Sequence, residues 1–229
     1  MILKKKQCHQ RQKRLKRNGG NFGEILLNNQ LYFASLPMNP LKKFNIWFEE
    51  EHQQQQQLRF PAACCLSTIG VDGYPNARFV SLKEVTENGF VITGTLSSQK
   101  GKEIQQKSTA ALTFWWTATE RQVRIQGDVI EISEAEAIQY FKERSLDSQL
   151  VSTVFDQGKR IENFEVMQTT FQQKKETLAT SIIKKPEHWS GICIQPKRIE
   201  FMDFKTSRLH ERTVFEGSTG NWTSYCIQP

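Results

Sequence analysis

Two dipeptides most limit the folds that are open to this chain of 229 residues: Asp72-Gly73 and Asn88-Gly89. Each lies between short runs rich in β-branched and aromatic residues, at about 60–69, 76–85 and 90–96. Asp-Gly or Asn-Gly in that setting is the strongest short-range signal for a β-hairpin turn. The pattern therefore predicts an antiparallel meander of three strands.

Later segments extend this meander. Residues 109–116 and 121–132 are strand-like, and the second run alternates apolar with polar side chains. Residues 189–201 and 214–227 are predicted to be closing strands. We expect a mainly β protein of the α+β class, in which six or so antiparallel strands form a barrel decorated with helices.

The predicted helices have clear start signals. Asn39 is a typical N-cap with Pro40 at the first helical position, and Ser133 with Glu136 has the spacing of a capping box. Tyr140 and Arg144 are four residues apart, so one face of the second of these helices should carry both. The expected helices span about 39–57, 100–106, 133–144 and 161–178.

The net charge of +7 belongs to the N-terminus, because residues 1–20 contain eight Lys or Arg and no acidic residue. Such a segment can bind polyanions such as nucleic acid or an anionic surface. We favour a solvated, disordered tail over residues 1–20 and a single domain over 21–229. A nucleic-acid partner is the weaker interpretation.

The five cysteines are Cys8, Cys64, Cys65, Cys193 and Cys226. They show no C-x-x-C or Cys/His ligand spacing, so we expect no zinc site and interpret the thiols as buried and inert. No apolar run approaches the ~20 residues that a membrane span needs, and no signal-peptide pattern follows the basic start. A cytoplasmic protein is the expectation.

Motifs for dinucleotides, nucleoside triphosphates, nucleophilic serine or catalytic zinc are absent from the sequence. What remains is a set of cationic and polar residues at predicted strand ends and turns, as a compact phosphorylated ligand requires. Lys100 also opens a helix, where backbone N–H groups favour a phosphate. The set comprises Arg78, Lys83, Lys100, Arg121 and Gln122.

Six collinear segments show the order of these residues: NPLKKFNIWF at 39–48, RFVSLK at 78–83, SSQKGKEI at 97–104, ERQVRIQG at 120–127, YFKERSLDSQ at 140–149 and RIEFMDFKTSRLHER at 198–212. In this order the chain resembles the pyridoxamine 5′-phosphate oxidase family from about residue 36 to the C-terminus. The resemblance implies an FMN-binding split β-barrel and a homodimer with FMN between the subunits.

The resemblance also implies roles for individual residues. Arg78 and Lys100 would contact the FMN phosphate, while the other implied cofactor contacts are Phe79, Val80, Ser81, Leu82, Lys83, Thr93, Gly94, Gln99, Gln122, Gln157, Gly158, Met202 and Arg212. The substrate phosphate would be bound by Lys83, Tyr140, Arg144 and Ser148. Arg208 and His210 would be catalytic residues over the substrate ring, with Leu209 between them.

Several of these positions depart from the usual family pattern. Thr93-Gly94 replaces a Tyr-Thr or similar pair, Gln99 replaces Arg, Gly158 replaces Ser, and Met202 replaces Trp. The substitutions concern the flavin more than the substrate phosphate. A charged hydrogen bond to phosphate contributes roughly 1.5–3 kcal/mol, so the loss of a cation should weaken FMN binding.

Three functions remain open. The first is an FMN-dependent oxidase that makes pyridoxal 5′-phosphate from the amine or the alcohol, with O2 as acceptor and H2O2 as product. The second is a flavin oxidase of the same fold that acts on another ring substrate, as in phenazine pathways. The third is a protein that binds FMN or pyridoxal phosphate without turnover.

Overall fold

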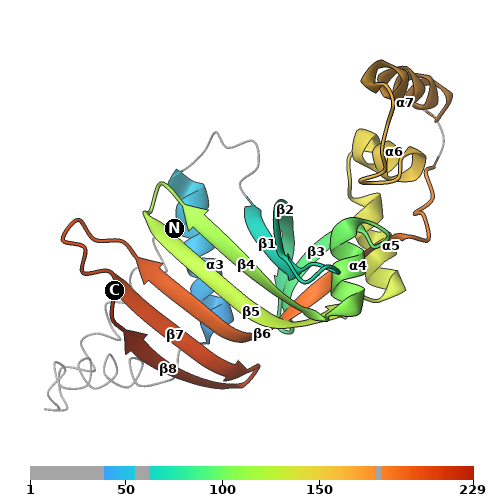
Figure 1. The fold of residues 1–229 in the computed structure, drawn as a ribbon. Helices are drawn as coiled ribbons and strands as arrows, with labels where there is room; N and C mark the ends of the chain where they lie inside the picture. The colour runs from blue at the N-terminus through green and yellow to red at the C-terminus, as the bar shows by residue number, and fades with distance from the viewer. Residues whose placement is uncertain (1–38, 55–61, 179–181) are drawn as a thin grey trace, which may run out of the picture. The chain divides into compact units, whose positions relative to one another are not determined.

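Eight strands form one antiparallel sheet in the computed structural model, which describes residues 39–54, 62–178 and 182–229 (Figure 1). The strands are β1 Ala63–Ile69, β2 Pro75–Thr86, β3 Gly89–Thr95, β4 Thr109–Trp116, β5 Arg121–Glu131, β6 Trp189–Asp203, β7 Glu211–Ser218 and β8 Asn221–Ile227. The helices are α3 Pro40–Gln54, α4 Gln99–Gln106, α5 Glu134–Lys142, α6 Leu146–Val154 and α7 Phe164–Leu178.

The first six strands close into a barrel. Their order in the sheet is β3-β2-β1-β4-β5-β6, and an additional pairing of β3 with β6 joins the two edges. The last two strands extend the sheet beyond the barrel, because the second half of β6 pairs with β7 and β7 pairs with β8. The predicted barrel is confirmed, with two strands outside it.

Local sequence signals produce the turns and helix starts that were expected. Gly73 and Gly89 adopt φ angles of 86° and 144°, which side chains strongly disfavour. The Ser133 side chain accepts a hydrogen bond from the Glu136 backbone, and the Glu136 carboxylate accepts from the Ser133 backbone. The two hairpins and the capping box are therefore confirmed.

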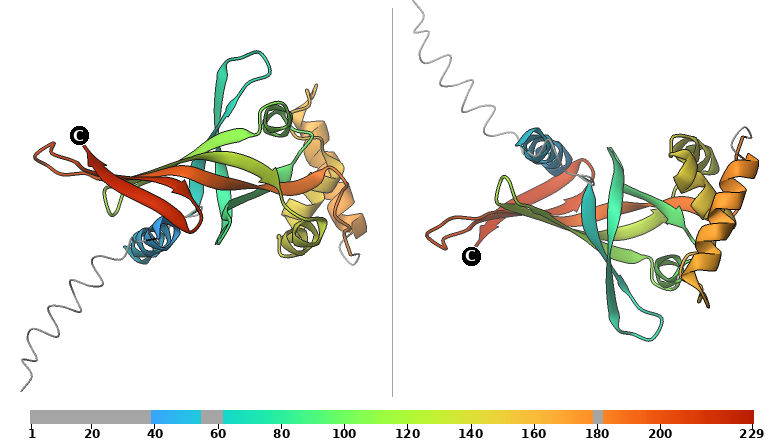
Figure 2. Two further views of the ribbon diagram at one scale, coloured as in Figure 1. Left: turned by 90° about the horizontal axis from the view of Figure 1, so that it is seen from below. Right: turned by 90° about the horizontal axis from the view of Figure 1, so that it is seen from above.

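Helix α3 contributes the centre of the barrel core. Its start is capped by Asn39, whose Oδ1 accepts a 2.9 Å hydrogen bond from the Leu41 N–H. Phe44 is fully buried, with its ring centroid 4.9 Å from that of Phe90 and 5.0 Å from that of Phe114. The three views show α3 on the opposite side of the barrel from α5, α6 and α7 (Figures 1 and 2). Residues 55–57 of the predicted helix lie outside the described residues.

The helical region after the barrel differs from the prediction. The expected helix over 133–144 ends at Lys142, and Ser145 caps a second helix, α6, which the sequence analysis missed. Ile161 lies before α7, and none of the side chains of α7 is buried. Its apolar residues therefore do not form the core-facing stripe that their spacing suggested.

Among the cysteines, Cys64 and Cys193 are buried and Cys65 is partly buried, but Cys226 is exposed on the outermost strand β8. The expectation of buried thiols is wrong for Cys226, because an edge strand outside the barrel has little to pack against. Cys8 and the predicted tail lie outside the described residues. Among the helices of residues 39–54, 62–178 and 182–229, none is long and apolar enough to cross a membrane.

Candidate functional site

Two cations lie together where β2 meets the first turn of α4. The Arg78 guanidinium donates a 2.8 Å hydrogen bond to Glu103 and a second bond to Thr68 Oγ1. Lys100 Nζ donates to Ser98 Oγ at 3.1 Å and to Gln157 Oε1 at 2.9 Å. Burial and the neighbouring charge of Arg78 lower the pKa of Lys100. Two cations held this close favour an anion beside them.

Gly94 on β3 lies beside the end of the Lys100 side chain. A Cβ at this position would lie 3.4 Å from both Cε and Nζ of Lys100. Gly101 allows the helix to approach, since a Cβ there would lie 1.9 Å from the carbonyl oxygen of Leu96. The structure thus gathers Arg78, Gly94, Gln99, Lys100 and Gln157, with Gln99 bonded to Glu103.

Glu103 is a member of this cluster that the sequence analysis missed. Its side chain is fully buried and bridges α4 to β1 and β2. Burial opposes ionisation, but hydrogen bonds from Thr68, Gln99, Arg78 and Asn76 outweigh burial and lower the pKa of Glu103. The sequence offered no signal for this role, because three of its four partners are at least 25 residues away in the chain.

A second cluster lies between β2 and α5. Lys83 Nζ donates a 2.7 Å hydrogen bond to Glu143 and lies 5.2 Å from the centroid of the Tyr140 ring. The Tyr140 hydroxyl donates a 2.5 Å bond to Glu84. Burial and the Glu84 bond raise the pKa of Tyr140, so its phenol stays neutral. A bulge between Leu82 and Glu84 lets two consecutive side chains, Lys83 and Glu84, both reach α5.

The prediction that Arg144 and Tyr140 share one helical face is wrong, because α5 ends at Lys142. The Arg144 guanidinium lies 5.0 Å from the centroid of the Trp189 ring and donates a 2.7 Å bond to Ser152 Oγ. Ser148 lies in the first turn of α6 and accepts a 2.8 Å bond from Ser145 Oγ. His188 connects the two clusters. Its backbone carbonyl accepts a hydrogen bond from Leu96, just before α4, and its ring bonds to the backbone of Ser152, the residue whose side chain Arg144 contacts. The two clusters are therefore neighbours.

A third group of predicted residues forms a row across the sheet. Gln122 on β5 is paired with Met202 on β6, which is paired in turn with Arg212 on β7. Trp115 on β4 extends this row, since it is paired with Gln122. It is 52% exposed and was missed as a site residue, although its outward parity next to Gln122 could have identified it.

The loop from β6 to β7 carries the predicted catalytic residues at the same end of the sheet. Arg208 is exposed and has a φ of 67°, a left-handed conformation that is costly for a side chain. His210 Nδ1 accepts a 3.1 Å bond from the Lys205 N–H, so the neutral ring carries its proton on Nε2. Leu209 between them is 71% exposed.

The two cationic clusters and the predicted catalytic residues lie far apart within one chain. Ser190, the β6 partner of Gly94, and Met202 are twelve residues apart, which corresponds to about 40 Å of extended strand. Figure 1 shows α4 and α5 near one end of β6, and β7 beginning near the other. One copy of the chain therefore does not bring Lys100 and Lys83 together with Arg208 and His210.

The segment Phe79–Leu82 links the first two clusters along β2. Phe79 is 80% exposed, Ser81 is exposed, Val80 is half-buried, and Leu82 is buried. Arg78 shares its register position with the buried Leu66, so it lies on the interior face while Phe79 lies on the outer face. Phe79 is therefore an exposed apolar side chain beside the cationic clusters.

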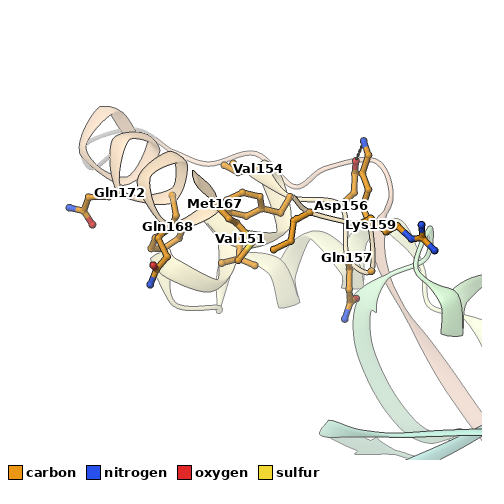
Figure 3. A pocket seen from close by; sticks show the side chains of 13 residues that line it. Val151, Val154, Asp156, Gln157, Lys159, Met167, Gln168 and Gln172 are labelled. Carbon is orange, nitrogen blue, oxygen red and sulfur yellow. Dashed lines mark hydrogen bonds and ion pairs between the residues drawn. The ribbon is translucent and has the colours of Figure 1, made fainter. Parts of the chain in front are cut away.

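A cavity of about 820 Å³ lies between α6, α7 and the loop that joins them (Figure 3). Its lining includes apolar side chains such as Val151, Val154 and Met167. Gln157 and Gly158 belong to the same loop, and Gly158 has a φ of 88°. Of the predicted site residues, only these two line this cavity.

Comparison with known proteins covers nearly all of the described residues. A family model described as pyridoxamine 5′-phosphate oxidase matches residues 49–177, and one described as the pyridoxine 5′-phosphate oxidase C-terminal dimerisation region matches 189–229. A protein of Gloeothece citriformis named pyridoxine/pyridoxamine 5′-phosphate oxidase is 38% identical over 192 residues, which is 83% of this chain and 89% of the relative. A protein of the same name from Nostoc punctiforme is 39% identical over 193 residues, 84% of this chain and 89% of that protein.

Solved structures share the fold. PhzG from Burkholderia lata 383, in complex with tetrahydrophenazine-1-carboxylic acid, has a TM-score of 0.78 at 22% identity, covering 86% of this chain and 96% of its own. A pyridoxamine 5′-phosphate oxidase-related, FMN binding protein from Nostoc punctiforme has a TM-score of 0.67 at 18% identity, covering 85% and 99%. At these identities the likeness concerns the fold alone.

Proposed function

The chain belongs to the pyridoxamine 5′-phosphate oxidase family, and from this membership we propose that it is an FMN-dependent oxidase of vitamin B6 metabolism. It converts pyridoxamine 5′-phosphate or pyridoxine 5′-phosphate to pyridoxal 5′-phosphate. Oxygen is the electron acceptor and is reduced to H2O2, while the amine substrate also consumes water and releases ammonia.

One observation carries this proposal: two neighbouring but separate cationic clusters lie at the same end of the barrel. Arg78 and Lys100 form one, and Lys83 with the Tyr140 phenol and Arg144 forms the other. Each cluster suits one phosphate, because cations and neutral donors give charge-assisted hydrogen bonds to a dianion. A phosphorylated cofactor together with a phosphorylated substrate accounts for both.

The residues of the first cluster fit FMN. Burial and the nearby charge of Arg78 lower the pKa of Lys100, and a phosphate between the two cations relieves their repulsion. Gly94 leaves space beside the Lys100 ammonium. FMN, when bound, supplies the hydride-accepting chemistry, while the protein supplies orientation and electrostatics. The remaining implied contacts, Phe79–Leu82, Thr93, Gln99, Gln122, Gln157, Gly158, Met202 and Arg212, stay part of this proposal.

The second cluster binds the substrate phosphate. Lys83, Arg144 and Ser148 donate to its oxygens, and the Tyr140 phenol, being neutral, also acts as a donor. Glu143 and Glu84 accept hydrogen bonds from Lys83 and Tyr140, so the substrate phosphate has to replace these carboxylates as the acceptor. Arg208 orients the pyridine ring and assists removal of the proton from the C4′ substituent, with the Nε2–H of His210 as a neighbouring donor.

The proposed enzyme is a homodimer with each active site shared between subunits. Arg208, His210 and Gln122 lie at the far end of β6 from Lys100, so the partner subunit has to supply them. The match of residues 189–229 to a C-terminal dimerisation region supports this assembly. The exposed Phe79 and Trp115 side chains are consistent with surfaces that the cofactor or the partner covers.

The test is a titration of the purified protein with FMN, followed by anaerobic addition of pyridoxamine 5′-phosphate in the same cuvette. We expect the flavin absorbance to shift on binding, to bleach with substrate and to recover on admission of air. Bleaching only with a non-phosphorylated ring substrate would favour a phenazine-type oxidase, and binding without bleaching would indicate a non-catalytic protein. Removal of residues 1–20 separately tests the nucleic-acid interpretation of the tail.

A further inference from the structure

The most highly coordinated buried charge near the proposed cofactor site is the carboxylate of Glu103. This side chain is 0% exposed, and a buried carboxylate is tolerated only when hydrogen bonds compensate for its lost hydration. Its two oxygens accept four hydrogen bonds from side chains. The donors are Thr68 Oγ1 at 2.5 Å, Asn76 Nδ2 at 2.5 Å, Arg78 Nη2 at 2.8 Å and Gln99 Nε2 at 3.0 Å.

Arg78 is held by this network along one edge. Its Nη2 donates to Glu103 and its Nη1 donates to Thr68 Oγ1, while Thr68 itself donates to the same Glu103 oxygen. The guanidinium is planar and carries five N–H groups in a fixed arrangement. Fixing one edge therefore sets the direction of the remaining donors. The Arg78 side chain is still 25% exposed, which leaves part of it accessible to a ligand.

We propose that Glu103 is a positioning residue, which orients Arg78 so that its free N–H groups point at the phosphate of the cofactor. The inference rests on the proposed function, since it takes FMN as the ligand. Glu103 itself does not contact the phosphate, because two negative groups would repel. Its contribution is to fix the cation that does.

Gln99 is a neutral hydrogen-bond partner of Glu103, so Arg78 is the cation that this carboxylate binds. Its amide donates a hydrogen bond to Glu103 Oε1, while Arg78 uses Oε2. Gln99 is neutral, so the local charges are Arg78 and Lys100 against Glu103, and only these two cations can face the phosphate.

Two other roles for Glu103 give different results when its charge is removed. If Glu103 only opposes the phosphate by repulsion, Glu103→Gln tightens FMN binding. If Glu103 only stabilises the fold, the substitution weakens the binding of FMN and of riboflavin alike. A positioning role predicts a loss that depends on the phosphate, because riboflavin has the same ring system and lacks that group.

The experiment measures the dissociation constants of FMN and riboflavin for the full-length apoprotein by flavin fluorescence. We expect Glu103→Gln to raise the constant for FMN at least tenfold and that for riboflavin less than twofold. Thr68→Val, which removes the acceptor of Arg78 Nη1, should have a smaller effect with the same selectivity. This variant also decides the matter if Glu103→Gln does not fold.

Glu51→Gln is the matched control. Glu51 is 3% exposed and accepts hydrogen bonds from the backbone of Ala118 and Thr119, so it is a buried carboxylate in another part of the barrel. Its substitution should leave the ratio of the two constants unchanged. A second possible result is that the unaltered protein prefers FMN while the ratio of the two dissociation constants stays the same in Glu103→Gln and Thr68→Val. That result overturns the positioning role and leaves the proposed cofactor in place. Failure of the unaltered protein to bind FMN overturns the proposed cofactor and this role together.

Discussion

Lys100 Nζ donates a 2.9 Å hydrogen bond to Oε1 of Gln157, which ties the first turn of α4 to the loop between α6 and α7. The bond joins two residues that are 57 positions apart in the chain. It holds the ammonium of a half-buried lysine beside Arg78, at the place proposed for the cofactor phosphate.

The first prediction concerns the pH dependence of FMN binding. Burial and Arg78 lower the pKa of Lys100 below its usual value of 10.5. Only the ammonium form binds phosphate strongly, so FMN affinity should be full below the lowered pKa and fall as pH rises through it. FMN and riboflavin dissociation constants measured from pH 8 upward test this, because riboflavin corrects for ionisation of the shared ring.

Lys100→Met should remove this pH dependence and weaken FMN binding. Loss of a charged hydrogen bond costs roughly 1.5–3 kcal/mol, which corresponds to about a 10- to 150-fold rise in the dissociation constant. A variant that binds FMN as tightly as the unaltered protein would show that Lys100 does not contact the phosphate.

The second prediction concerns competition for Lys83. Glu143 accepts its hydrogen bond at 2.7 Å, and this bond contributes first to the lowered pKa of Glu143. Glu143→Gln removes the charge with which the substrate phosphate competes, so KM for pyridoxamine 5′-phosphate should fall by about two- to fivefold, the range of an exposed ion pair. Asp128→Asn, which breaks the 3.2 Å pair with Lys197, is the control and should leave KM unchanged. A higher KM for Glu143→Gln would mean that Glu143 supports the substrate site.

The third prediction concerns backbone strain at Arg208. Its φ of 67° disfavours any residue with a Cβ by roughly 1–2 kcal/mol, whereas glycine adopts it freely. Arg208→Gly should therefore be more stable than Arg208→Ala by about 1 kcal/mol in urea unfolding. Both variants should lose at least tenfold in kcat/KM, because each lacks the guanidinium. Equal stability of the two would indicate that the loop relaxes when Arg208 is replaced.

The fourth prediction tests the shared active site with mixed dimers. Lys83→Met alters β2, and Arg208→Ala alters the loop between β6 and β7, so each homodimer should have low activity at both sites. A heterodimer purified through two different tags contains one site with both residues intact, and it should recover about half of the activity of the unaltered dimer. No recovery would argue that Lys83 and Arg208 act within the same subunit.

Residues close together in the sequence account for most of what could be predicted. The Asp72-Gly73 and Asn88-Gly89 turns, the Asn39 cap and the Ser133–Glu136 capping box each depend on contacts within about four residues, and all are found in the structure. The resemblance to the family added the order of the site residues. Helix α6 escaped detection, because the predicted helix ended at residue 144 and Ser145 was not considered as the cap of another helix. Its side chain accepts a hydrogen bond from the Ser148 N–H.

The sequence by itself determined the barrel class, the hairpins and the residues that carry cationic chemistry, because turn geometry and alternation are local properties. Only the tertiary structure decided which residues meet. Glu103 joins Arg78 across 25 positions, and Gln157 joins Lys100 across 57. The tertiary structure also places Lys100 and Arg208 near opposite ends of β6, since this long strand pairs with β3 at its start and with β7 at its end. Such contacts depend on strand register and barrel closure, which no short segment of sequence encodes.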